Sequence, residues 1–345
     1  MSELPGIDVA RLVPWLQSNV DGLTGDLDFE LIAGGRSNLT YRVSDSAGRQ
    51  VVLRRPPVSD VLATAHDMSR EHRVMAALAP TPVPVPTMLA FCDDPEITGA
   101  PFYVMEFVDG AIVRGRDQAE ALSTSARRAI GSRMIEVLSA LHAVDPPQVG
   151  LGDLGRPDGY LERQLRRWSK QVEQSKTRDL PVIEDVHRRL SAAVPPQTET
   201  RIVHGDFRLD NLVAGPDGEV RAVLDWELCT LGDPLADLGL LMVYWSEPDD
   251  AWAALGQGAA TAAPGFSSRA ELKQAYATST GRDLSQLGFY VAFGYWKLAC
   301  ILEGVLSRWR HGAMGEELRN AADEFEQGVE RLAEAADRAA AELGI

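Results

Sequence analysis

The stretch from about Phe29 to Leu53 alternates between apolar and polar positions with the period of a β-strand. Two such runs flank Gly34-Gly35 in the segment LIAGGRSNLTYRV, and the segment RQVVLRR adds a third predicted strand. A helical period follows in AHDMSREHRVMAALA, where Met68 and His72 recur near one face. Beyond PTPVPVP, which cannot form the interior of a helix, TMLAFC and PFYVMEFV are two further predicted strands.

After Asp109-Gly110 the pattern becomes helical, in TSARRAIGSRMIEVLSALHAV, YLERQLRRWSKQVEQS and PVIEDVHRRLSAAV. A short β interlude with a PDG turn runs from Arg201 to Trp226, and helical patterns then continue to the end. The pattern predicts an α+β chain in two parts. Residues 1–107 should form an N-terminal helix plus an antiparallel sheet with one helix, and residues 108–345 a larger, mainly helical part.

The length and net charge of the chain indicate which classes of partner it can bind. The chain has 345 residues, of which 45% are hydrophobic, so it can bury a sizeable core without disulfide or metal staples. Fifty acids against 34 Lys and Arg give a net charge of -16. We therefore expect neither a nucleic acid nor an anionic membrane as the main partner, because phosphate backbones require clustered positive charge.

A few residues bear on the cellular compartment and on whether the chain spans a membrane. The acidic start of the chain lacks the pattern of a signal peptide, and Cys92, Cys229 and Cys300 stand alone, so we expect a reducing, cytoplasmic setting. The apolar stretch from Phe289 to Leu306 is interrupted by Lys297, which predicts a buried helix and no membrane span.

The strongest chemical signal is the run HGDFRLDN, followed by LDWE. Asp206 and Asn211 lie five residues apart in a loop after a short strand, and Asp225 follows on the next hairpin. Oxygen ligands such as those of Asn211 and Asp225 suit magnesium, and Asp206 is then left to accept a proton from a hydroxyl group. These groups together are typical of phosphoryl transfer, whereas a lone Asp in such a loop is equally typical of a turn cap.

This pair of motifs resembles the catalytic loop and metal-binding motif of the aminoglycoside phosphotransferase-like kinases. The resemblance implies a bilobal protein-kinase-like fold that binds ATP and Mg²⁺ in a cleft. In such kinases a glycine-containing hairpin covers the nucleotide phosphates, and Gly34, Gly35, Ser37 and Asn38 occupy the corresponding place. A Gly-Gly hairpin alone is weak evidence, since most are simple turns.

The resemblance also implies a cation on the next strand, paired with phosphates and with a helix carboxylate. The order of the chain predicts Arg54 and Glu71 for these places. The family usually has lysine there, and arginine is not its equivalent. Arg54 therefore either does the work of the lysine in a variant geometry or is a surface charge. Glu106, Phe107 and Val108 resemble the connector that grips adenine.

The resemblance extends from about Phe29 to Arg310. Within the family the chain is most similar to one subgroup, and the segments that carry this likeness are LRRPP, AHDMSREHRVMAAL, TPVPVPTMLAFCDD, FYVMEFVDGAIV, QLRRWSKQ and FGYWKLACILEG. In this subgroup, whose kinase-like domains occur alone in actinobacteria and fused to acyl-CoA dehydrogenases in animals, the strand cation is arginine. The animal domains are thought to phosphorylate 4-hydroxyacyl-CoA. A hydroxyacyl-CoA substrate and a functional link to an acyl-CoA dehydrogenase are therefore expectations. We expect no dehydrogenase domain in a chain of this length.

A CoA thioester carries phosphates, so its site needs local cations. The substrate candidates are Arg163, Arg167, Arg208, Glu227 and Lys297. A helical arginine is more often part of a solvated face, whereas a lysine in an apolar run is costly unless it is paired or faces a cavity. An aminoglycoside site would instead need gathered carboxylates, and those of the last helix are spread around it.

Three further polar residues have a structural interpretation. Asp233 is predicted to cap the helix that follows it, Asp237 to tie that helix to the catalytic loop, and His204 to hold the loop by hydrogen bonds. Three functions stay open at this point: a kinase for a hydroxylated metabolite, an aminoglycoside or macrolide kinase, and a nucleotide-binding pseudokinase that regulates a partner.

Overall fold

The computed structural model describes residues 4–33, 38–58, 67–248, 250, 260–310 and 322–345. The chain divides into two compact units. The first comprises Met1–Gly110 and Arg221–Cys229, and the second comprises Ala111–Val220 and Thr230–Ile345. The division after Gly110 lies three residues beyond the expected 107/108 boundary. The short return of residues 221–229 to the first unit was not foreseen.

The first unit is built on a five-stranded antiparallel sheet in the order β1-β2-β3-β5-β4. Its strands are β1 (Leu27–Ala33), β2 (Leu39–Asp45), β3 (Gln50–Arg55), β4 (Met88–Cys92) and β5 (Phe102–Glu106). These are the five strands that the sequence predicts. The helices of this unit are α1 (Val9–Asn19), α2 (Met68–Leu78) and the short α3 (Pro95–Thr98), and residues Trp226–Leu228 form a 3₁₀ turn.

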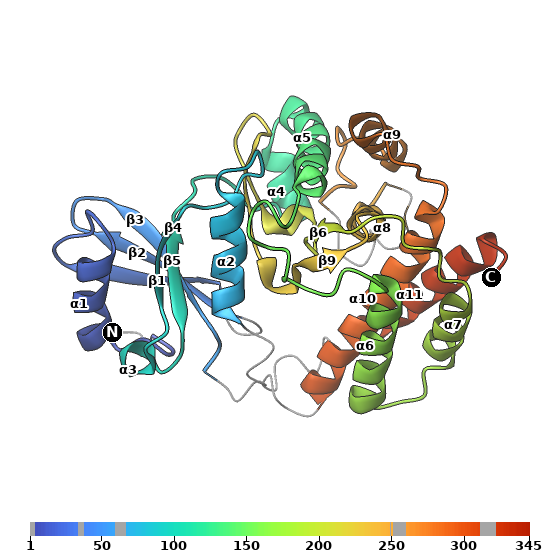
Figure 1. Ribbon diagram of the computed structural model, residues 1–345, viewed down its shortest axis with the longest axis horizontal. Helices are drawn as coiled ribbons and strands as arrows, with labels where there is room; N and C mark the ends of the chain where they lie inside the picture. The colour runs from blue at the N-terminus through green and yellow to red at the C-terminus, as the bar shows by residue number, and fades with distance from the viewer. Residues whose placement is uncertain (1–3, 34–37, 59–66, 249, 251–259, 311–321) are drawn as a thin grey trace. The chain divides into compact units, whose positions relative to one another are not determined.

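The two faces of the sheet bury different helices. Tyr41, Val43 and Phe102 point to one face, where they form a core with Leu12 and Leu16 of α1. Because side chains alternate along a strand, Tyr103 points to the other face, where α2 packs against β4 and β5. Figure 1 shows α1 and α2 on opposite sides of the sheet.

The second unit is mainly helical. Its helices are α4 (Arg116–Ala121), α5 (Thr124–Ala143), α6 (Tyr160–Ser175), α7 (Pro181–Ala192), α8 (Leu235–Tyr244), α9 (Arg269–Thr280), α10 (Leu287–Arg310) and α11 (Ala322–Glu342). The predicted β interlude appears as β6 (Arg201–Val203), the 3₁₀ turn Leu209–Asn211, β7 (Leu212–Ala214), β8 (Val220–Val223) and β9 (Thr230–Gly232). β6 pairs with β9, and β8 leads the chain out of this unit.

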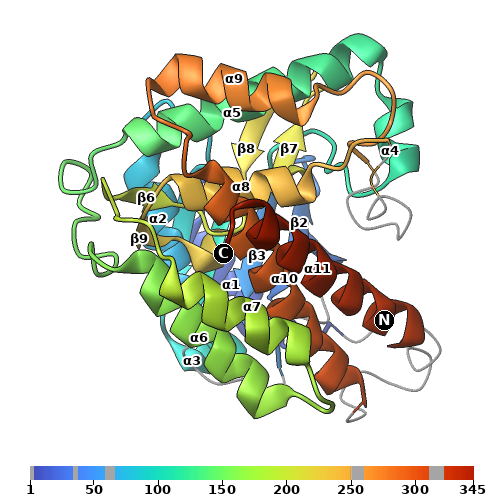
Figure 2. The ribbon, with the colours of Figure 1, turned by 90° about the vertical axis from the view of Figure 1, so that its right-hand side faces the viewer.

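Helix α10 is the centre of the second unit. It packs against α6, α7, α8 and α11, and Figure 2 shows α10 and α11 side by side. In the part of the chain that the structure describes, only its stretch Leu287–Arg308 is long and apolar enough to cross a membrane, with a mean hydropathy of 1.4. That stretch is 72% buried inside the protein, as the sequence predicts for a core helix.

Candidate active site

The turn that carries Asp206 follows β6 and is held by buried side chains. Asp237 of α8 accepts hydrogen bonds from the backbone N–H of His204 at 2.6 Å and of Gly205 at 2.8 Å, which confirms the predicted tie. Gly205 has a φ of 84°, a left-handed conformation that a residue with a side chain adopts only with strain. The sharp turn at Gly205 therefore depends on glycine and on the Asp237 carboxylate together.

The Asp237 carboxylate is in turn held in place by a second buried residue. His142 of α5 places its Nε2 3.3 Å from the Asp237 carboxylate and its Nδ1 2.7 Å from the hydroxyl of Tyr276. Burial opposes ionisation of Asp237, but hydrogen bonds from His142 and Gly205 hold its pKa below the ordinary value. Burial lowers the pKa of His142, so the pair favours a neutral imidazole beside an ionised carboxylate.

The Asp206 side chain is oriented by its own loop. The Asp206 N–H donates to His204 Nδ1 at 3.2 Å, as expected for a histidine that holds the loop. Asn211 Nδ2 donates to the Asp206 carboxylate at 3.0 Å and to its carbonyl oxygen at 2.9 Å. These bonds occupy the nitrogen of the Asn211 amide and direct its oxygen away from Asp206, which suits a metal ligand.

Arg208 lies beside the carboxylates of the loop. Its guanidinium is 3.6 Å from the Asp206 carboxylate, 3.1 Å from that of Asp210, and 4.8 Å from the ring centroid of Tyr244. Burial, and after it the nearby Asp206 carboxylate, raise the pKa of Tyr244 well above its ordinary value. Sequence reasoning missed Tyr244, although it lies two helical turns after Asp237 and therefore on the same face of α8.

Lys297 of α10 lies beneath this loop. Its side chain is only 4% exposed, and Nζ donates to the carbonyl oxygen of Gly205 at 2.8 Å. The ammonium is 5.8 Å from the ring centroid of Trp168 on α6. The lysine that interrupts the apolar run is therefore paired inside the protein, and this placement favours support of the loop over contact with a substrate.

The other cations proposed for a substrate lie on α6. Arg163 donates to the backbone carbonyls of Asp158 and, at 2.6 Å, of Arg156. Arg167 is exposed, with its guanidinium 5.0 Å from the ring centroid of Trp168. Arg163 therefore fastens the start of its helix, whereas Arg167 stays available to a ligand.

Within the first unit, Arg54 belongs to a buried cluster of charged side chains. Its Nε lies 3.3 Å from the Glu71 carboxylate and its Nη2 2.5 Å from the Asp225 carboxylate. The side chain is 14% exposed, so the interpretation of Arg54 as a surface charge is wrong, and the predicted ion pair with Glu71 is present. Burial opposes the charge of Arg54, but Tyr103, Glu71 and Asp225 together raise its pKa.

Glu71 has two further partners in this cluster. It accepts hydrogen bonds from Asn38 Nδ2 at 3.0 Å and from the Tyr103 hydroxyl at 2.9 Å. Burial raises the pKa of Glu71, and Arg54 opposes that shift. Asp225 has a φ of 65°, the single positive value among the non-glycine residues that the structure describes. Backbone strain of this kind is concentrated at functional sites.

The remaining candidates of the first unit are partly described. Gly34, Gly35 and Ser37 lie outside the described residues. Glu106 ends β5 and accepts a hydrogen bond from the Thr87 hydroxyl at 2.8 Å, and Phe107 has the Arg42 guanidinium 5.8 Å from its ring centroid.

Val108 follows Phe107 and is half-buried. Glu227 contributes to the electrostatic field at Arg54. Asn211 belongs to the second unit and Asp225 to the first, so their shared magnesium site stays a prediction from the sequence.

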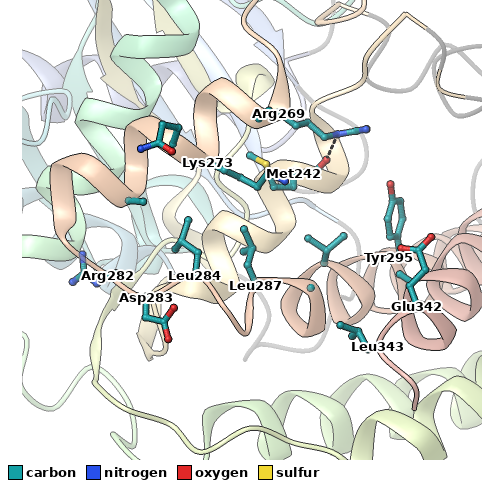
Figure 3. A pocket seen from close by; sticks show the side chains of 16 residues that line it. Met242, Arg269, Lys273, Arg282, Asp283, Leu284, Leu287, Tyr295, Glu342 and Leu343 are labelled. Atoms are coloured by element: carbon teal, nitrogen blue, oxygen red, sulfur yellow. Dashed lines mark hydrogen bonds between the residues drawn. The ribbon is translucent and has the colours of Figure 1, made fainter.

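An open pocket of about 710 Å³ lies elsewhere in the second unit (Figure 3). It is lined by residues of α8, α9, α10 and α11 and of the segment between α9 and α10, and it includes none of the predicted site residues. Two of its cations are engaged, because Arg269 donates to the Met242 carbonyl and pairs with Asp250, and Arg282 pairs with Glu199. The chemistry therefore points to the Asp206 loop and not to this pocket.

The sequence profile of the phosphotransferase enzyme family matches residues 28–272. The chain belongs to this family. Its relatives include acyl-CoA dehydrogenase family member 10 of Mus musculus, 38% identical over 288 residues, and family member 11 of Gallus gallus, 35% identical over 317 residues. The matches cover 83% and 90% of this chain but only 27% and 40% of the two relatives, so the chain spans less than half of either.

Solved structures agree with the fold of this phosphotransferase family member. A Ralstonia eutropha protein, provisionally named an aminoglycoside phosphotransferase, is 35% identical with a TM-score of 0.79, over 97% of this chain and 98% of that one. A GDP complex of aminoglycoside 2'-phosphotransferase-IIIa is 15% identical with a TM-score of 0.62, over 94% and 97% of the two chains. The second likeness shows the fold alone, which is the kinase-like α+β fold that the motifs imply.

Proposed function

We propose that the protein transfers the terminal phosphoryl group of ATP to a hydroxyl group of a small molecule. The observation that carries the proposal is the fixed orientation of Asp206, whose N–H is held by His204 and whose carboxylate accepts a hydrogen bond from Asn211. A carboxylate held in one place can orient a substrate hydroxyl and accept its proton as the phosphoryl group arrives.

Two of the candidate residues carry donor atoms that suit a magnesium nucleotide. The amide oxygen of Asn211 and the carboxylate of Asp225 are hard oxygen donors of the kind that Mg²⁺ prefers. In phosphoryl transfer the metal ion neutralises charge on the phosphates. The protein itself would have two roles. Glu71 would hold Arg54 toward the phosphates through their ion pair, and Asp206 would align the acceptor hydroxyl.

We propose a hydroxyacyl-CoA as the acceptor, and a functional link to an acyl-CoA dehydrogenase. The support is the likeness to acyl-CoA dehydrogenase family members 10 and 11, which covers 83% to 90% of this chain. Arg167 and the other exposed cations of α6 offer charge complementary to CoA phosphates.

The charge of α11 counts against a polyamine antibiotic as the acceptor. Glu326 pairs with Arg178, and Asp337 pairs with Arg189, so these carboxylates are already matched by arginines of the protein. Recognition of several amino groups needs carboxylates that converge on the ligand. The acidic last helix therefore supports the packing of the second unit more than it supports binding of an aminoglycoside.

The proposal is tested with purified protein, Mg²⁺, and either ATP or GTP as donor. The acceptors are a panel of hydroxyacyl-CoAs of different chain length and hydroxyl position, with kanamycin as the competing class. Nucleoside diphosphate release is measured, and mass spectrometry identifies the acceptor that has gained a phosphoryl group. We expect transfer to a hydroxyacyl-CoA and none to kanamycin.

Asp206→Asn separates chemistry from binding. Loss of the base should lower the rate of transfer by about a thousandfold, while nucleotide affinity stays within about twofold. Asp217→Asn, in an exposed turn, is the matched control and should retain full activity. Wild-type turnover by Asp206→Asn would refute the role of Asp206. Nucleotide binding without transfer to any acceptor would instead favour a pseudokinase.

A further inference from the structure

The peptide that joins Gly205 to Asp206 is held at both ends by side chains. Its N–H, that of Asp206, donates to His204 Nδ1 at 3.2 Å, and its carbonyl oxygen accepts from Lys297 Nζ at 2.8 Å. Rotation of this peptide would break both hydrogen bonds. Because the peptide leads directly into Asp206, its orientation sets the direction of that carboxylate.

Burying the Lys297 ammonium costs free energy of solvation. Its side chain is 4% exposed, and burial lowers its pKa, while the carboxylates of Asp206 and Asp237 act in the opposite direction. A methionine of similar size could fill the same volume without the cost of removing an ammonium from water. The lysine therefore adds two things that packing does not need, a donor to Gly205 and a positive charge beneath the loop.

Trp168 is a second partner of the Lys297 ammonium. The ring centroid is 5.8 Å from Nζ, within the range of a cation–π contact, and the indole N–H donates to Gln164 at 3.1 Å. The ring is 5% exposed and is thus held in place within α6. The ammonium thus has two partners, the Trp168 ring and the Gly205 carbonyl oxygen.

We propose that Lys297 is a positioning residue for Asp206, acting through the Gly205–Asp206 peptide. The inference rests on the proposed function of Asp206 in phosphoryl transfer. A displacement of about 1 Å at a reacting group can lower a rate by about a hundredfold, so a loosened peptide should reduce turnover without loss of nucleotide binding.

Lys297→Met tests the proposal in the full chain, with Lys273→Met on the exposed face of α9 as the matched control. Hydrogen–deuterium exchange of residues 202–212 is measured by mass spectrometry. We expect exchange about tenfold faster in this segment and unchanged exchange in α5, because a hydrogen bond to a charged group is lost locally. We also expect kcat about a hundredfold lower, with KM for the nucleotide within about twofold.

Two results would overturn the proposal. One is loop exchange and kcat equal to those of Lys273→Met, and the other is faster exchange spread over the whole second unit, which indicates simple destabilisation. If Lys297→Met does not fold, Lys297→Arg is compared with Lys297→Gln. The cationic donor should restore slower exchange and higher kcat, and equal values would count against the proposal. Absence of transfer by the wild-type protein would refute the proposed function, while the exchange measurement still tests the positioning role.

Discussion

Replacing Arg54 by methionine should destabilise the first unit mainly through Glu71, because its other partner, Asp225, is 29% exposed and can be solvated by water. Arg54 is 14% exposed and Glu71 only 1%, and their charged groups are 3.3 Å apart. Removal of one member of a buried ion pair costs about 3–5 kcal/mol, because the other charge is left without compensation. Glu71 keeps its hydrogen bonds from Asn38 and Tyr103 and can also take up a proton, so we expect the low end, about 3 kcal/mol.

The penalty should depend on pH. Burial already raises the pKa of Glu71 above 4.5, and Arg54 opposes that shift, so its removal raises the folded pKa further. A raised folded pKa means that the folded state binds more protons, and stability is then lost as pH rises. The free energy difference between wild type and Arg54→Met should therefore be small below about pH 4.5 and grow toward neutral pH.

Urea denaturation followed by circular dichroism, at several pH values, measures this difference. Arg42→Met on β2 is the control, because Arg42 is 33% exposed and its partner Glu30 is 53% exposed, so its loss should cost less than about 1 kcal/mol. Glu71→Gln should remove most of the Arg54→Met penalty in the double variant. A penalty no larger than that of Arg42→Met, or one independent of pH, would refute the reasoning.

Two further substitutions test the support of the catalytic loop. Asp237→Asn puts a donor against backbone N–H groups and should cost about 3 kcal/mol by thermal and chemical denaturation. The pKa of Asp237 is held below 3.8 in the folded protein, so the wild-type carboxylate loses its stabilising charge as the pH falls below that value. The free energy cost of Asp237→Asn should therefore shrink at acidic pH, and a cost independent of pH would contradict this reasoning. Tyr244→Phe removes the hydroxyl beside Asp206 and should lower kcat by about threefold to tenfold without loss of folding. Unchanged kcat with an unchanged melting temperature would show that the hydroxyl has no part in turnover.

The sequence predicted the five strands and the helices α1 and α2 of the first unit, because its strand-like runs are bounded by turns that contain glycine and proline. It did not predict the short helix α3. The sequence also predicted the ion pair of Arg54 with Glu71 and the tie of Asp237 to the catalytic loop. Each of these follows from the position of a charged residue relative to a recognisable motif. No alternating pattern, by contrast, marks residues 221–229 as part of the first unit, since that assignment depends on contacts distant in sequence.

The parts that sequence reasoning missed are mostly long-range partners of buried polar groups. Tyr276 contacts His142 across 134 residues of sequence, and Lys297 contacts Gly205 across 92. An apolar run with one lysine shows that the lysine must have a partner, but it does not show which one. The carbonyl of Gly205 becomes that partner through the packing of α10 against the catalytic loop, a contact that no local pattern encodes.

The return of residues Arg221–Cys229 to the first unit has a consequence for synthesis. When the ribosome has completed Gly110, Arg54 can already pair with Glu71, but its second carboxylate, Asp225, has not yet been made. Arg70 likewise waits for the carbonyl of Cys229, to which it donates at 2.8 Å. The first unit thus reaches its full set of charge partners only after Ala111–Val220, about half of the second unit, has been synthesised, so completion of the first unit depends on prior synthesis of part of the second.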